Sequence, residues 1–266
     1  MFLATLFENL TGLENVDMWL QIAIMIVAAL IVLIGLASGI VSIVLAIKYV
    51  KFNRTDNHIG LTGEDVARKI LDDNGLNHIR VSKNGSLLFG NSYSHYFKKV
   101  RLRRLTYRKK SISSLAMAAQ KSSLAILDKE GDKDMKSRVI LTPIITFGPL
   151  AFIPLIIIGV LIDILVFGFS GKVTFVFAIL GLAFYVLSFI LSINTLKVEI
   201  KAQNRAYEIL KTNNMATEQE LEMMKELFHL YNIEYVNDMI LAFLEMLYRV
   251  LMIVAKAQSA ARSNND

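Results

Sequence analysis

The stretch MWLQIAIMIVAALIVLIGLASGIVSIVLAI, Met18–Ile47, contains no charged residue. It exceeds the roughly 20 apolar residues that a helix needs to cross a hydrocarbon core of about 30 Å. It is also too long for the core of a signal peptide, and no basic residue precedes it. We therefore interpret it as a retained membrane anchor, which agrees with a hydrophobic content of 54% over 266 residues.

Further apolar stretches follow later in the chain. Val139–Phe169 contains a single charged residue, Asp163, and Val173–Leu196 contains none. Each of the two is long enough to span a membrane. The last apolar segment, Tyr235–Ala255, carries charged residues on one stripe of a helix, so it is predicted either to span the membrane or to lie in its interface.

Positive charge is concentrated after the first apolar stretch. Residues 51–136 contain 18 Lys and Arg against nine Asp and Glu, whereas residues 1–17 contain only acidic charges. Cytoplasmic loops of membrane proteins carry the excess of basic residues. We therefore expect a multi-pass protein with its N-terminus outside and residues 51–136 in the cytoplasm.

The predicted fold is a mainly α integral membrane protein with three to four transmembrane helices and a small cytoplasmic α+β module. In the module, Thr62 with Asp65 predicts a capped helix, HIRVS and VRLRRL predict short strands, and 111–127 is a second helix. Thr217 with Glu220 predicts another helix start. Four parts follow: the external N-terminus and first transmembrane helix (1–50), the module (51–136), a transmembrane hairpin (137–196), and cytoplasmic helices with the terminal membrane-spanning or interfacial helix (197–266).

The chain has no cysteine, which excludes disulfides, thiolate zinc ligands and a cysteine nucleophile. Its four histidines contain no pair spaced by four residues, so none of them is predicted to bind a metal. They are His58, His78, His95 and His229.

Three motifs carry a resemblance to a known family. LTGEDVARKILDDNGL, residues 61–76, is similar to L-T-G-x-E-V-A-R-x-I-L-D-x-N-G-L in the YugP-type neutral zinc metallopeptidases, which are bacterial integral-membrane proteins. KKVRLRRLTYRKKSISSLAMAAQ, residues 98–120, resembles that family's V-R-L-S…Y…S-I-A-A…A-A-H. LKVEIKAQNRA, residues 196–206, resembles its L-P-V-E-F-[ND]-A-S-x-R-A. The resemblance implies a metallopeptidase-like module in a bacterial inner-membrane protein.

The resemblance also implies a zinc site that this chain lacks. In the family, H-E-x-x-H on a helix supplies two zinc ligands and a general base. Gln120, Lys121 and Leu124 stand at those three positions, and Glu199 stands where the third ligand is expected. An amide is a poor zinc ligand, an ammonium group accepts no proton, and leucine has no lone pair. We predict that zinc binding and catalysis are lost. Two readings of Glu199 stay open: it is a carboxylate at the start of a helix, where the helix dipole favours it, or it forms an ion pair with Lys121.

The run KKVRLRRLTYRKK forms a basic patch beside the predicted membrane spans. Basic residues near a membrane are attracted to anionic headgroups by about 1 kcal/mol each. We prefer this reading to nucleic-acid binding, because no recognised nucleic-acid module surrounds the interleaved Tyr107. The patch consists of Lys98, Lys99, Arg101, Arg103, Arg104, Arg108, Lys109 and Lys110.

The resulting hypothesis is a pseudopeptidase without a cofactor that acts as a scaffold or regulator of a membrane protein complex. The expected partners are the lipid bilayer, its anionic headgroups, and a membrane protease or another membrane protein. Two alternatives stay open: an active membrane metallopeptidase whose site uses other residues, and a protein that binds anionic lipid surfaces. The sequence does not indicate the oligomeric state.

Overall fold

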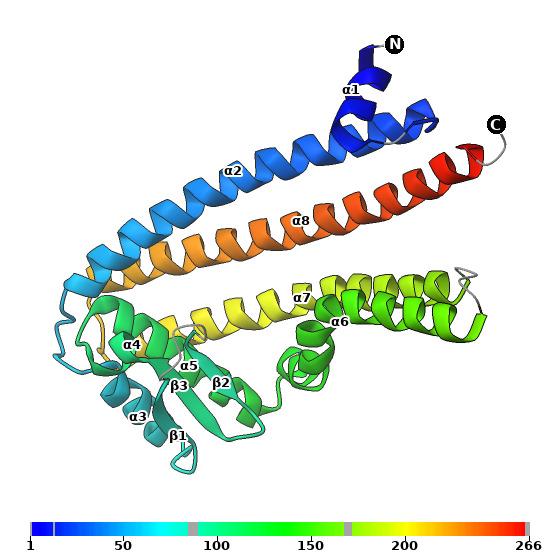
Figure 1. Cartoon of the computed structure of the whole chain (residues 1–266). Coiled ribbons are helices and arrows are strands. Elements are labelled where there is room, and N and C mark those ends of the chain that lie inside the picture. The colour runs from blue at the N-terminus through cyan, green and yellow to red at the C-terminus, as the bar shows by residue number, and fades with distance from the viewer. Residues whose placement is uncertain (1, 13, 85–89, 168–171, 264–266) are drawn as a thin grey trace. The chain divides into compact units, whose positions relative to one another are not determined.

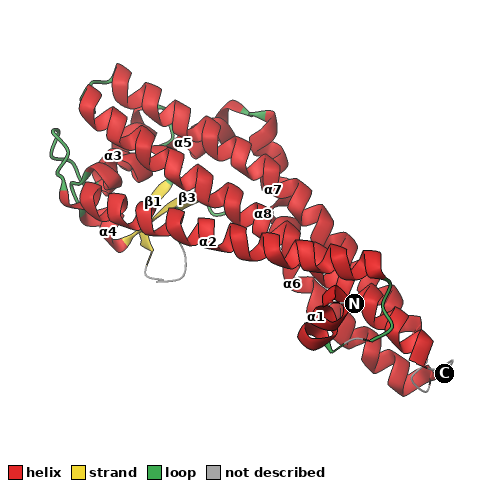
Figure 2. Ribbon diagram, turned by 90° about the horizontal axis from the view of Figure 1, so that it is seen from above, coloured by secondary structure: helices red, strands yellow, loops and turns green. Residues whose placement is uncertain are grey.

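The computed structural model describes residues 2–12, 14–84, 90–167 and 172–263. The chain is mainly helical, and its strands, yellow in Figure 2, form one small sheet among the described residues. Contacts divide it into two units. Unit 1 comprises residues 1–40, 148–189 and 236–266, and unit 2 comprises residues 41–147 and 190–235.

Four long helices, labelled in Figure 1, contribute residues to both units. Each is built on one of the apolar stretches found in the sequence. The expected turn between the second and third stretches falls mostly outside the described residues. The helices are α2 (Met18–Arg54), α6 (Lys133–Phe167), α7 (Lys172–Thr212) and α8 (Glu218–Ser263).

Two of the described helices, α2 and α7, are long and apolar enough to cross a membrane. Helix α6 contains a shorter apolar stretch, Ile153–Val166. This is fewer than the three to four spans that the sequence predicts. In α8, Asp238, Glu245 and Arg249 interrupt the apolar segment. These charged residues lower the mean hydropathy of α8 below that of α2 and α7.

In unit 1, α1 (Phe2–Thr11) packs Phe7 into a cluster with Leu20 and Ala255. Asp163, the single charged residue of the second apolar stretch, has a structural role in unit 1. Asp163 is fully buried and accepts hydrogen bonds from the Thr174 backbone N at 2.7 Å and from Thr174 Oγ1 at 2.6 Å. Because the first N–H groups of a helix have no partner within the helix, this carboxylate caps the start of α7.

Unit 2 contains the α+β module. A three-stranded sheet has the order β1-β3-β2, with β1 parallel and β2 antiparallel to β3. Two strands lie where the sequence predicts them, within about two residues, while β2 is additional. The elements are α3 (Gly63–Asp73), β1 (Arg80–Asn84), β2 (Ser92–Ser94), β3 (Lys99–Arg103), α4 (Arg104–Arg108) and α5 (Ile112–Glu130).

Helix α5 is the centre of unit 2, and its residues 112–127 are all buried. Ser111 caps its start, and Gly131, in the left-handed conformation, ends it. Alanines and serines make up much of the helix, so neighbouring backbones approach it closely. The helix contacts α3, α4, β2 and β3, and its apolar side chains join one core with those of α3 and β3.

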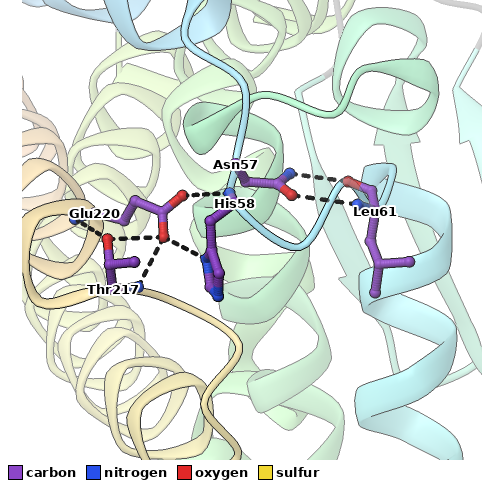
Figure 3. Close-up of polar contacts among 5 residues, drawn as sticks. All are labelled: Asn57, His58, Leu61, Thr217 and Glu220. Atoms are coloured by element: carbon purple, nitrogen blue, oxygen red, sulfur yellow. Dashed lines mark hydrogen bonds and ion pairs between the residues drawn. The ribbon is translucent and has the colours of Figure 1, made fainter.

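Two capped helix starts predicted from the sequence are confirmed. At one of them, the capping residue also contacts a turn elsewhere in unit 2. Thr62 and Asp65 form a capping box at α3. At α8, Glu220 N donates to Thr217 Oγ1 at 3.2 Å, while Thr217 N donates back to Glu220 Oε2 at 2.7 Å. The buried Glu220 carboxylate also accepts from His58 N at 2.7 Å and contacts His58 Nδ1 at 2.7 Å (Figure 3). The turn before α3 is thereby tied to α8.

Gly63 allows the closest backbone approach in unit 2. A Cβ atom at this position would lie 2.0 Å from the backbone oxygen of Thr106. We expect Gly63→Ala to lower the free energy of unfolding by about 2 kcal/mol or more, because α4 must move to relieve the clash. Thermal unfolding in detergent measures this effect. The matched control is Gly35→Ala, where a Cβ meets nothing within 4 Å; equal melting temperatures for the two variants would contradict the prediction.

Candidate functional site

Of the two readings of Glu199, the structure shows the ion pair with Lys121. Lys121 Nζ donates to Glu199 Oε2 at 2.9 Å, and Gln120 Nε2 donates to the same oxygen at 2.9 Å. The other carboxylate oxygen, Oε1, accepts from Arg138 Nη2 at 2.6 Å. Helices α5, α6 and α7 therefore meet at one carboxylate within unit 2. We call these four residues the Glu199 cluster.

Three of the four residues that the resemblance singles out belong to this cluster, and the fourth does not. Leu124 is 1% exposed and packs with Leu127, Val198 and Ala202 in an apolar group beside it. This packing positions Glu199 next to α5, since Val198 precedes it directly in α7. The apolar group thus holds α7 against the helix on which Gln120 and Lys121 lie.

Arg138 is the member of the cluster that sequence reasoning missed. It lies in α6 between a charged segment and the second apolar stretch. A basic residue at the end of an apolar stretch is typical of the charge bias that orients membrane proteins, so it suggests no side-chain contact. No local pattern relates it to Glu199, which is 61 residues away. Its contact is a product of helix packing.

Glu199 follows the charge-free stretch Val173–Leu196 and remains ionised at neutral pH. Burial alone would raise the pKa of its carboxyl group, but the charges of Lys121 and Arg138 lower that pKa to about 2. One carboxylate is shared by two cations, so the cluster carries a net positive charge. A buried charge requires such compensation, because an isolated one is very costly in a low-dielectric interior.

A second polar group surrounds Asp128 at the end of α5. Its Oδ2 atom accepts from the Tyr93 hydroxyl at 2.6 Å and contacts His95 Nδ1 at 2.7 Å, and Lys98 Nζ lies 3.6 Å away. Burial alone would raise the pKa of Asp128, but the hydrogen bonds with Tyr93 and His95 hold it below its usual value. Burial next to Asp128 also raises the pKa of the Tyr93 hydroxyl.

The residues at the motif helix do not fit the zinc ion that the resemblance implies. An ammonium group and a guanidinium group lie against the single carboxylate, and neither has a lone pair to offer a metal. Across the described part of the chain, no group of three or more His, Cys, Asp or Glu side chains is placed to hold a metal ion. His58 and His95 each contact a carboxylate instead.

The basic patch covers β3, α4 and the residues next to them. Two aromatic side chains at the β2–β3 connection lie beside it: Tyr96 is 68% exposed and Phe97 is 70% exposed. The Arg101 guanidinium lies 5.4 Å from the centre of the Phe97 ring. One arginine of the basic patch thus lies against an exposed aromatic ring.

The low pKa of Glu199 predicts a specific loss of stability in acid. Because the folded-state pKa of about 2 lies below the ordinary value of 4.5, the stabilisation is complete above about pH 4.5 and disappears as pH falls toward 2. It is on the order of 3 kcal/mol for a shift of this size. We expect Glu199→Gln to be less stable than the native chain at pH 7 and to lose less stability below pH 4.5, as measured by thermal unfolding. Glu218→Gln, at an exposed position, is the control. If Glu199→Gln lost as much stability below pH 4.5 as the native chain does, the low pKa of Glu199 would be refuted.

Comparisons with known proteins identify the family of this chain. The family described as "Putative neutral zinc metallopeptidase" matches residues 22–254. "Putative membrane protease YugP" from Bacillus subtilis (strain 168) is 24% identical over 203 residues, which cover 76% of this chain and 85% of that protein. No solved structure matches. With a match over most of its length, this chain belongs to the neutral zinc metallopeptidase family.

Proposed function

We propose that this chain is a catalytically inactive member of its family that acts by binding, as a scaffold or regulator of a membrane protein complex. The observation that carries the proposal is the Glu199 cluster. Lys121 lies on the motif helix at the position of the family's general base, and its ammonium group binds the carboxylate that is expected to be a zinc ligand. The cluster therefore provides ion pairs where the family's chemistry needs a metal.

The chemistry of the three motif positions supports this proposal. Hydrolysis by an H-E-x-x-H enzyme needs a metal-bound water and a carboxylate that accepts its proton. The ammonium group of Lys121 cannot accept that proton. Leu124 lies in an apolar group and has no ligand atom. Restoring the mechanism would require at least these two positions and Gln120 to change together.

The proposed setting is a bacterial inner membrane. The apolar helices α2 and α7 and the relative named a membrane protease support membrane association. We propose three to four membrane spans, an external N-terminus and a cytoplasmic module, because basic residues dominate residues 51–136. The proposed partner is a membrane protease or another membrane protein, since a scaffold without catalysis acts through what it binds.

Metal analysis tests the loss of zinc directly. We expect the purified native chain to contain no stoichiometric zinc by mass spectrometry and to leave casein intact. Gln120→His/Lys121→Glu/Leu124→His should bind about one zinc per chain if the scaffold is retained. Gln120→His/Lys121→Glu, which lacks the second histidine, is the matched control and should bind zinc more weakly. Stoichiometric zinc in the native chain would refute the proposal and favour an active peptidase with other ligands.

The exposed aromatic residues favour a second candidate function, the binding of anionic lipid surfaces through the basic patch. Tyrosine and other aromatic rings prefer membrane interfaces, and basic side chains bind the anionic headgroups there. Tyr96 and Phe97 are exposed beside Arg101, so this edge offers both kinds of contact. This function is compatible with an inactive metallopeptidase fold.

Lipid retention tests the second candidate. We expect the native chain in mixed micelles to retain phosphatidylglycerol in preference to phosphatidylcholine, measured by mass spectrometry of the bound lipid. Arg101→Gln/Arg103→Gln/Arg104→Gln should lose most of this preference, because each basic group contributes about 1 kcal/mol near an anionic surface. Lys69→Gln/Lys211→Gln/Lys225→Gln removes the same charge elsewhere and serves as the control. Equal loss in both triple variants would show that net charge alone is responsible.

A further inference from the structure

A groove of about 150 Å³ lies between α7 and α8 within unit 1. It runs along α7 from Phe175 to Tyr185 and along α8 from Met246 to Val254. Its lining residues are apolar apart from Tyr185 and Arg249. No residue of the Glu199 cluster lines it, so the proposed loss of catalysis does not account for it.

Arg249 gives this groove a positive charge. The residue is exposed, and it forms no hydrogen bond or ion pair with any other residue that the structure describes. Glu245 lies one turn earlier in α8, where a pair with Arg249 is possible in a helix, but the two side chains form no ion pair. An exposed cation thus borders an otherwise apolar groove.

The position of the groove along α7 places this cation at membrane depth. In the charge-free stretch Val173–Leu196, Phe175 stands near the start and Tyr185 at the middle. The Tyr185 hydroxyl donates to Ala242 O at 3.3 Å, which brings this turn of α8 beside the middle of the stretch. Because α7 and α8 run antiparallel (Figure 1), Arg249, about two turns beyond Ala242, faces the half of the stretch between Tyr185 and Phe175.

A cation at this depth favours a carboxylate carried by another helix over a lipid phosphate. Side chains of a helix lean toward its N-terminus, so the Cα–Cβ bond of Arg249 tilts toward the middle of the stretch and away from the nearer headgroups. Charged residues within membrane spans pair with one another, because the hydrocarbon core solvates no charge. A helix carries such a carboxylate into the core with its own backbone groups satisfied.

We propose that the groove binds a transmembrane helix of a partner protein that has an aspartate or a glutamate within its apolar stretch. The carboxylate pairs with Arg249, and apolar side chains of the same helix pack as ridges into the groove between Phe175 and Tyr185. The proposal deepens the proposed function by giving the partner of the scaffold a chemical class. It rests on that function because it requires α8 to be one of the proposed spans.

Energy transfer between the labelled full chain and labelled transmembrane peptides in phosphatidylcholine vesicles tests the proposal. One peptide is a helix of leucine and alanine with a single glutamate within its apolar stretch, and the other has glutamine at that position. We expect saturable transfer with the glutamate peptide and at least about tenfold weaker binding of the glutamine peptide, because a charge-assisted hydrogen bond is lost. Equal binding of both peptides, or none, would overturn the proposal. Displacement of the glutamate peptide by phosphatidylglycerol would make a lipid the occupant and also overturn it.

Two variants locate the site, and the melting temperature of each confirms that it folds. Arg249→Gln should weaken binding of the glutamate peptide at least about tenfold, whereas Lys256→Gln, at an exposed position of α8 outside the groove, should not change it. Ala178→Phe fills the groove and should abolish binding, whereas Ala183→Phe, at an exposed position of α7 outside the groove, should not. Binding that survives both Arg249→Gln and Ala178→Phe would place the helix elsewhere and overturn the proposal.

Self-association is measured in parallel, because helix α8 of a second copy also carries a glutamate, Glu245. We expect no transfer between two labelled copies that depends on Arg249. Transfer that is lost in Arg249→Gln would make a second copy the occupant and overturn the proposal of a different partner. Zinc measured on the same native sample reports on the loss of catalysis separately, so the two proposals can fail independently.

Discussion

The ionised carboxylate of Glu199 is the interaction on which the centre of unit 2 depends. It lies at the junction of three helices and accepts hydrogen bonds from Gln120, Lys121 and Arg138. Removing one partner of a buried pair costs about 3–5 kcal/mol, because the other charge is left uncompensated. The cluster therefore fixes the position of α5 relative to the parts of α6 and α7 that belong to this unit.

The same junction links the fold to its chemistry. A metallopeptidase needs ligands with lone pairs around a cation, whereas here two side-chain cations surround one carboxylate. The two side-chain cations compensate the charge of Glu199, which is also what a bound metal ion would do.

Local patterns predicted local structure well in this chain. The capping boxes at Thr62 and Thr217, the apolar helices and two of the three strands follow from propensities that act within a few residues. Two of the described helices, α2 and α7, are long and apolar enough to cross a membrane, whereas the apolar stretch found in α6 is shorter and charged residues interrupt that of α8. Strand β2 was missed since three residues in a turn-rich region carry almost no periodic signal.

The sequence by itself determined the apolar helices, the absence of an H-E-x-x-H motif and the presence of a cation on the motif helix, because these depend on residue identity and short spacings. Through the family resemblance it also raised the ion pair of Lys121 with Glu199 as one of two readings of that carboxylate. Only the tertiary structure decided that Arg138 joins this pair, that His95 contacts Asp128, and that a cavity lies between them. The physical reason is that these contacts join residues 33 to 61 positions apart, and only the packing of helices brings such residues together.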